Sequence, residues 1–126
     1  MIKYDEIRMF HLELGNAFRG IKKFRVIIDK DTFQINDNLG HKKDINFNEI
    51  DEIKEFFYNL KLLALEDWKD VYISNKKIND PSYWKIVLKF NDGHYVEYRG
   101  VEEYPINWDK VVKLVSRYSY FFEVEE

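Results

Sequence analysis

The stretch from Tyr83 to Trp108 limits the possible folds most, because it predicts two strands, the turn between them and the start of a helix. Alternate residues from Trp84 to Phe90 are apolar, and side chains two apart lie on one face of a strand. A second strand is expected from His94 to Gly100, after the turn residues 91–93. The stretch therefore predicts an antiparallel hairpin with one face turned toward a core.

The apolar pattern also selects the length of the turn. A two-residue loop would pair Leu88 with Glu97 and place a charge opposite a core residue. A three-residue loop pairs Leu88 with Val96 instead. A slip of one residue in the pairing would move every side chain of the strand to the opposite face of the sheet. We therefore predict a type I turn closed by Gly93 in the left-handed region.

A helix is predicted to begin at Trp108. Pro105 keeps the residue before it extended, and Asn107 is expected to accept hydrogen bonds from the free N–H groups of the first turn. Asp109 suits the positive end of the helix dipole. Apolar residues then recur at helical spacing and predict a buried stripe of Trp108, Val111, Val112, Val115, Tyr118 and Phe122, widened by Leu114 and Phe121.

This part of the chain resembles a set of small uncharacterised bacterial α+β proteins that end in a strand-turn-strand-helix unit. The segment from Trp68 to Tyr72 is similar to the loop that precedes the unit, and Glu102 and Glu103 replace a small polar pair. No activity is known for the set, so the resemblance implies a fold and no catalytic residues. The residues that carry it are Trp84, Asp92, Gly93, Gly100, Tyr104, Pro105, Asn107 and Trp108.

The first half of the chain predicts three strands and a helix. The predicted strands are Tyr4 to Leu14, Phe24 to Ile28, and a third strand that holds Phe33 and Ile35. The segment from Asn36 to Asp44 is predicted to be a polar loop. A capping box then starts the helix, with Asn46 and Glu49 bonding to each other's backbone N–H groups. Inner faces are predicted for Phe10, Leu12 and Leu14, for Phe24, Val26 and Ile28, and for Ile50, Ile53, Phe57, Leu60 and Leu63.

These elements predict one α+β domain over residues 1–126, in the order βββαββα, with a single antiparallel sheet and two helices on one face. A chain of 126 residues with 45% hydrophobic composition is large enough to bury a core. It holds no cysteine, which fits a reducing compartment. No apolar stretch approaches a membrane span, so we expect a soluble, cytoplasmic protein without a membrane partner.

The sequence offers no constellation typical of catalysis. His11, His41 and His94 are far apart and are expected to be solvated or, for His94, half-buried on a strand. The pair Asp29 and Asp31 is explained by a hairpin turn, and the five glycines form no phosphate loop. We therefore predict that the protein is not an enzyme and uses no metal and no cofactor.

The leading hypothesis is a protein-binding module, such as a small inhibitor or immunity-type factor of a mobile element that occludes a larger enzyme. The hypothesis depends on the aromatic content of 17%, which is more than a small core can bury. Some aromatic side chains should therefore be exposed, and exposed aromatic side chains favour protein interfaces. The predicted contact regions are the segment from Trp68 to Tyr83, which includes most of the irregular stretch from Leu65 to Asp80, or the loop from Arg99 to Trp108. The candidate partner-binding residues are Trp68, Tyr72, Tyr83, Arg99, Glu102, Glu103 and Tyr104.

The alternative is a binder of nucleic acid or another anionic ligand. Arg19, Lys22, Lys23 and Arg25 alternate with apolar residues and form the one basic run that resembles such a site. An edge strand protected from aggregation by charge explains the same run, and the net charge of -3 argues against general nucleic-acid binding. Nucleic acid is therefore the less favoured partner.

Overall fold

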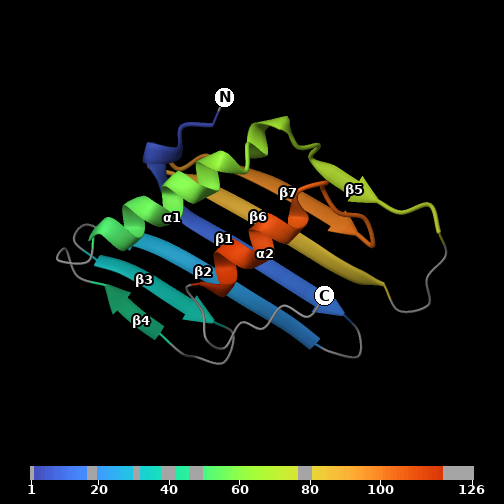
Figure 1. Cartoon of the computed structure of the whole chain (residues 1–126), viewed down its shortest axis with the longest axis horizontal. Coiled ribbons are helices and arrows are strands. Elements are labelled where there is room, and N and C mark those ends of the chain that lie inside the picture. The colour runs from blue at the N-terminus through green and yellow to red at the C-terminus, as the bar shows by residue number, and fades with distance from the viewer. Residues whose placement is uncertain are drawn as a thin grey trace.

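The computed structural model describes residues 2–16, 20–29, 32–37, 42–45, 50–76 and 81–117. Seven strands form one sheet in the order β4-β3-β2-β1-β6-β7-β5. Two helices, α1 (Ile50–Leu62) and α2 (Trp108–Ser116), lie side by side across one face of this sheet (Figure 1). The strands are β1 (Ile7–Asn16), β2 (Gly20–Asp29), β3 (Thr32–Asp37), β4 (Lys42–Ile45), β5 (Val71–Ile73), β6 (Ser82–Phe90) and β7 (Tyr95–Val101).

The predicted α+β class with both helices on one face is confirmed, but the predicted element order βββαββα and the purely antiparallel sheet are wrong. Two strands were missed. The first, β4, lies in the segment predicted to be a polar loop, and the second, β5, lies in the segment predicted to be irregular. The sheet is mixed rather than purely antiparallel, because β5 runs parallel to β7. Both missed strands are short strands at the edges of the sheet, and four and three residues are too few to show a clear apolar alternation.

The predicted hairpin between β6 and β7 is confirmed. Leu88 pairs with Val96, and Ile86 pairs with Tyr98, as the three-residue turn requires. Gly93 has a φ of 92°, in the left-handed region, and its N–H donates to the Phe90 carbonyl. The expected pairs between the second and third strands are also present, since Val26 faces Ile35 and Ile28 faces Phe33. The turn predicted at Lys30 and Asp31 lies outside the described residues.

The first strand changes register near its start. Ile7 pairs with Phe90, but Met9 pairs with Lys89, so the ladder contains an irregularity between Ile7 and Met9. This shift turns Ile7 into the core beside Phe10, although strict alternation would place it on the opposite face. This shift is the reason that apolar residues at odd and at even positions of β1 both face the core. Leu12 is fully buried as predicted, whereas Leu14 is only partly buried.

The core lies between the sheet and the two helices. Phe10, Phe24 and Phe56 meet at its centre, with the Phe10 and Phe56 rings 5.4 Å apart in an edge-to-face arrangement. The helix α1 is rotated slightly from its predicted orientation, because Phe56 is fully buried and Phe57 only partly. Leu60 and Leu63 are buried as predicted. The predicted capping pair of this helix, Asn46 and Glu49, lies outside the described residues.

The second helix begins at Trp108 as predicted, but its predicted cap is wrong. Asn107 occupies the N-cap position without a side-chain hydrogen bond to the helix. Its amide instead bridges two other elements: Oδ1 accepts from Trp68 Nε1 at 3.0 Å, and Nδ2 donates to the Leu63 carbonyl at 2.9 Å. The helix buries Val111, Leu114 and Val115, and the predicted contacts of Tyr118, Phe121 and Phe122 lie outside the described residues.

Candidate functional site: the uncovered face of the sheet

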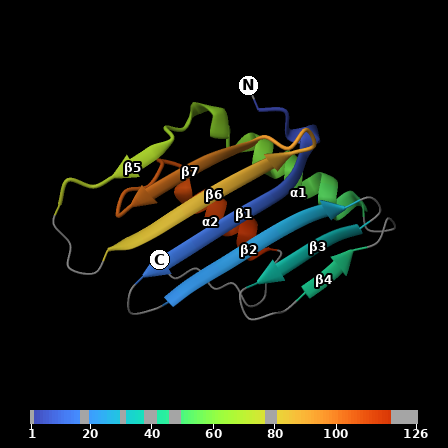
Figure 2. The ribbon, with the colours of Figure 1, turned by 180° about the vertical axis from the view of Figure 1, so that it is seen from behind.

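The opposite face of the sheet has no helix over it in the described part of the chain, and it lies toward the viewer in Figure 2. Strand alternation brings cross-strand neighbours into rows on this face. One row runs Arg25, His11, Val87 and Glu97, and the next runs Lys23, Glu13, Lys85, Arg99 and Val71. A third row runs Ile21, Gly15, Tyr83, Val101 and Ile73.

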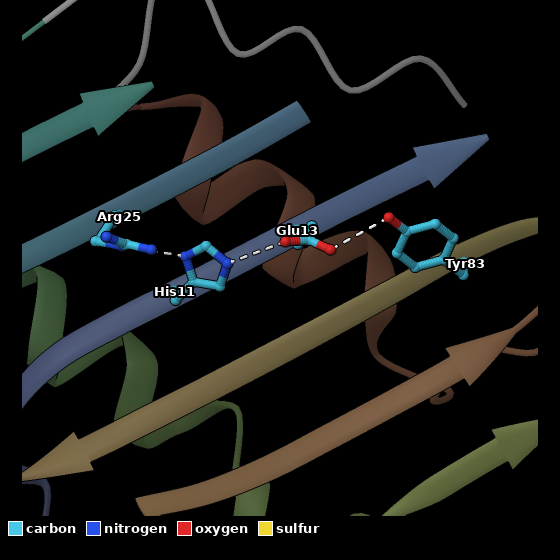
Figure 3. Close-up of polar contacts among 4 residues, drawn as sticks. All are labelled: His11, Glu13, Arg25 and Tyr83. Carbon is cyan, nitrogen blue, oxygen red and sulfur yellow. Dashed lines mark hydrogen bonds and ion pairs between the residues drawn. The ribbon is translucent and has the colours of Figure 1, made fainter. Parts of the chain in front are cut away.

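A polar network occupies the middle of this face. Figure 3 shows its four side chains, which come from β2, β1 and β6. The Nε of Arg25 donates to Nδ1 of His11 at 3.3 Å, and Nε2 of His11 lies 3.4 Å from an oxygen of Glu13. The hydroxyl of Tyr83 donates to the other Glu13 oxygen at 3.2 Å. The chain of contacts therefore links three neighbouring strands.

His11 is the buried member of the network, although it was predicted to be a solvated histidine. It is 6% exposed, and both of its ring nitrogens contact neighbouring side chains, those of Arg25 and Glu13. Its pKa lies below the usual 6.5 because of burial first and the positive charge of Arg25 second; Lys85 lowers it further, while Glu13 opposes the shift. An imidazole that accepts at Nδ1 and donates at Nε2 is the neutral form that these partners require.

Two other groups of the network titrate away from their ordinary values. Burial works to raise the pKa of Glu13, but hydrogen bonds from His11 and Tyr83 and the charge of Lys85 outweigh it and leave that pKa lowered. Burial and the adjacent Glu13 carboxylate raise the pKa of the Tyr83 phenol. Near neutral pH the network therefore holds one carboxylate, one guanidinium, one neutral imidazole and one neutral phenol.

Gly15 lets Tyr83 lie close to the sheet. A Cβ on Gly15 would stand 2.0 Å from Cε1 of the Tyr83 ring, which pairs with it across the strands. The ring thus occupies the space above the glycine, and its hydroxyl reaches Glu13 from there. This close approach explains why a glycine, which is unfavourable within a strand, occupies position 15.

The face is basic although the chain is acidic. Among the residues of β1, β2, β6 and β7 whose side chains the structure describes, five cations alternate onto it, and two carboxylates, Glu13 and Glu97, accompany them. The chain as a whole carries a net charge of -3. We call the five cations the basic face: Lys23, Arg25, Lys85, Lys89 and Arg99.

No family model, curated protein or solved structure matches this chain. The resemblance to small bacterial α+β proteins therefore stays a prediction. Neither helix in the described ranges is long and apolar enough to cross a membrane. No group of three or more His, Asp or Glu side chains within those ranges is placed to hold a metal ion.

The predicted partner-binding residues do not form one surface. Trp68, Tyr72 and Tyr104 lie on the helix side of the sheet, whereas Tyr83 and Arg99 lie on the uncovered face. The three on the helix side join an aromatic cluster around the buried Trp84, whose ring is 5.8 Å from Trp68 and 5.9 Å from Tyr72. Tyr104 packs on Trp108 at 5.3 Å. Most of this aromatic content therefore stabilises the fold.

Glu102 and Glu103 follow β7 at the open end of the β6–β7 hairpin, next to the start of β6. Glu102 has a φ of 53°, and its carboxylate accepts from the N–H of Ser82. The carbonyl of Glu103 accepts from Trp84 Nε1 at 2.8 Å. Because the Glu102 carboxylate bonds to the backbone, reversing its charge would destabilise the protein as well as alter any binding.

The predicted anion-binding run is divided by strand geometry. Lys23 and Arg25 alternate onto the uncovered face, whereas Lys22 occupies the opposite parity of β2 and Arg19 lies outside the described residues. His94 is an exposed turn residue bonded to Asp92, not half-buried on a strand as predicted, and His41 lies outside the described residues.

Sequence reasoning missed His11, Glu13, Lys85 and Lys89 as members of one surface. Their spacing of two residues within each strand was the available sign of a shared face. Only the pairing of β1 with β6 brings the two sets together, and these strands are far apart in the chain.

Proposed function

We propose that the protein is a non-catalytic binding module whose uncovered sheet face docks an acidic surface of another protein. The observation that carries the proposal is the basic face itself, which gathers five cations on an acidic chain. Opposite charge across an interface steers association and selects the partner. A partner of opposite sign is therefore the one that this face suits.

Apolar side chains at one end of the face favour a protein over a polyanion. Ile21 is 48% exposed, and Val101 and Ile73 are 37% and 61% exposed in the same row. Val71 is exposed beside Arg99. Contact with these aliphatic groups stabilises a protein interface through burial of apolar area, whereas a phosphate backbone gains nothing from it.

The central network supports the proposal by holding the middle of the face in one arrangement. Arg25 and Tyr83 are each tied through a hydrogen bond to a neighbouring strand. Side chains that are ordered before binding lose less conformational entropy when a partner docks. The face therefore combines a preformed centre with an exposed charged and apolar periphery.

An inhibitor or immunity-type factor of a mobile element, acting in the cytoplasm, is the role we assign to this module. A small chain without a catalytic constellation acts on a larger enzyme by covering its surface. The lack of cysteine fits a reducing compartment. The proposed target is an enzyme with an acidic patch at or beside its active site.

A second candidate is binding of single-stranded nucleic acid. It is favoured by one observation: Lys23 and Arg25, two of the four residues of the basic run identified in the sequence, share their face with Lys85 and Arg99. A positively charged surface of this kind follows a phosphate backbone, and its affinity falls steeply with salt.

The test is capture of partners from host lysate by the full chain and by a Lys85→Glu, Arg99→Glu variant, at low and high salt and after nuclease treatment. Lys54→Glu, Lys61→Glu is the matched control, because both side chains are exposed on α1. We expect one acidic protein that survives nuclease, that is lost by the sheet variant and that is kept by the control. Retention abolished by nuclease selects the second candidate, and equal capture by both variants contradicts both.

A further inference from the structure

The two helices form a groove on the other side of the sheet from the basic face. The groove lies between α1 and α2, which run next to each other in Figure 1, and its volume is about 230 Å³. Three leucines contribute apolar surface, and Leu62 among them is 65% exposed. The lining residues are Asn59, Leu62, Leu63, Lys110, Lys113, Leu114 and Arg117.

The charged side of the groove comes entirely from α2. Lys110, Lys113 and Arg117 are spaced three and four residues apart, so they lie along one side of the helix. No acidic side chain in the described ranges forms an ion pair with any of them. The groove thus presents a line of cations beside an exposed leucine surface, with the Asn59 amide on the facing helix.

We propose that this groove binds an acidic, amphipathic segment of a partner protein. Its apolar side chain inserts between Leu62 and Leu114, while its carboxylates contact Lys110, Lys113 and Arg117. The volume decides the class of ligand, because pockets for drug-sized molecules measure roughly 300–1,000 Å³. A groove of about 230 Å³ is below that range and suits one or two side chains of a docked segment.

This site is independent of the proposed function. It lies on the helix side of the molecule and shares no residue with the basic face. A negative binding test of the groove therefore leaves the proposal for the basic face unaffected, and the reverse also holds. Variants of the two surfaces show which of the two proposals fails.

The experiment is a titration of the ¹⁵N-labelled full chain with a synthetic helical peptide that carries Leu on one side and Glu on the other, followed by NMR. We expect shifts concentrated at Asn59, Leu62, Lys113 and Leu114, with none at Lys85 or Arg99. The Lys113→Glu, Arg117→Glu variant should bind roughly tenfold more weakly or worse, whereas the Lys54→Glu, Lys61→Glu control should bind as the parent does.

Leu62→Ser tests the apolar part separately, and it should fold normally because Leu62 is largely exposed. We expect weaker binding of the same peptide, and no binding of a peptide with Lys in place of Glu.

Absence of shifts at about 1 mM peptide, an affinity at the weak limit of specific binding, overturns the proposal. It is also overturned if the shifts map to the basic face, or if charge reversal in the groove has no more effect than the control. Displacement of the peptide by laurate would assign the groove to a small anionic amphiphile, and loss of a dimer in the groove variant would assign it to a second copy of the chain.

Discussion

At the scale of single residues, two glycines are each covered by an aromatic side chain from the paired strand. Gly15 faces Tyr83 on the uncovered side of the sheet, and Gly100 faces Trp84 on the core side. A Cβ on Gly100 would lie 2.2 Å from Trp84 Nε1 and 2.7 Å from the Glu103 carbonyl oxygen. The two sites differ in how easily the neighbour can move.

Gly100→Ala should therefore destabilise the protein more than Gly15→Ala. We expect a loss of about 3 kcal/mol at Gly100, where the indole is fully buried and hydrogen-bonded, and about 1 kcal/mol at Gly15, where the end of the Tyr83 side chain can move outward. Urea denaturation of both variants measures the difference. In a Tyr83→Ala background the cost of Gly15→Ala should nearly vanish, and an undiminished cost there contradicts the contact.

His11 should make the protein less stable in mild acid. The unfolded chain protonates this residue near its usual pKa of 6.5, whereas the folded chain does so only at lower pH. Between these values the unfolded state binds more protons, so the free energy of unfolding falls as the pH falls below 6.5. Above 6.5 both states hold the neutral form and the effect disappears.

His11→Gln should flatten this dependence, because the replacement does not titrate. The measurement is urea denaturation of parent and variant at pH values from 7.5 to 5, with an NMR titration of the His11 ring to locate its pKa. A variant that keeps the parental slope assigns the pH dependence to other groups.

At the scale of elements, Asn107 joins the start of α2 to the end of α1 and to the short 3₁₀ turn η3 (Leu65–Asp67). One amide satisfies Trp68 Nε1 and the Leu63 carbonyl together. Trp68 in turn packs against Trp84 and Tyr98, each at 5.8 Å. The residue therefore fixes how the second helix sits on the sheet.

Asn107→Asp distinguishes this bridge from an ordinary helix cap. Asp is as good an N-cap as Asn and gains from the helix dipole, so a capping role predicts no loss of stability. A bridging role predicts a loss of about 1 kcal/mol, because Asp cannot donate to the Leu63 carbonyl. Thermal and urea unfolding of the variant decide between them, and a neutral or stabilising result argues against the bridge.

At the scale of the whole molecule, stability should decrease from the centre of the sheet to its edge. β1 pairs along nearly all of its length with β2 and β6, whereas β5 pairs through three residues with β7 alone. Amides held in the middle of a cooperative unit open only with global unfolding. We expect hydrogen exchange to be slowest at Phe10, Leu12, Ile86 and Leu88, and orders of magnitude faster in β5. Equal protection in β5 would contradict this gradient.

Local chemistry was enough to predict the hairpin after Trp84, the position of Gly93, the start of α2 and the α+β class. Alternation with period two specifies which side chains of a strand share a face, and turn residues specify the register of adjacent strands. It gives no such information for edge strands, so Lys42–Ile45 and Val71–Ile73 were missed. The bridging role of Asn107 was also hidden, because its partners belong to distant elements.

By itself, therefore, the sequence determined the local elements and the core-facing side of most strands. Only the tertiary structure decided which strands that are distant in the chain are neighbours. The pairing of β1 with β6 places His11 and Glu13 beside Tyr83 and Lys85, and so creates both the polar network and the basic face. The physical reason is that a strand's own pattern orients its side chains, whereas its partner is chosen by the packing of the whole core.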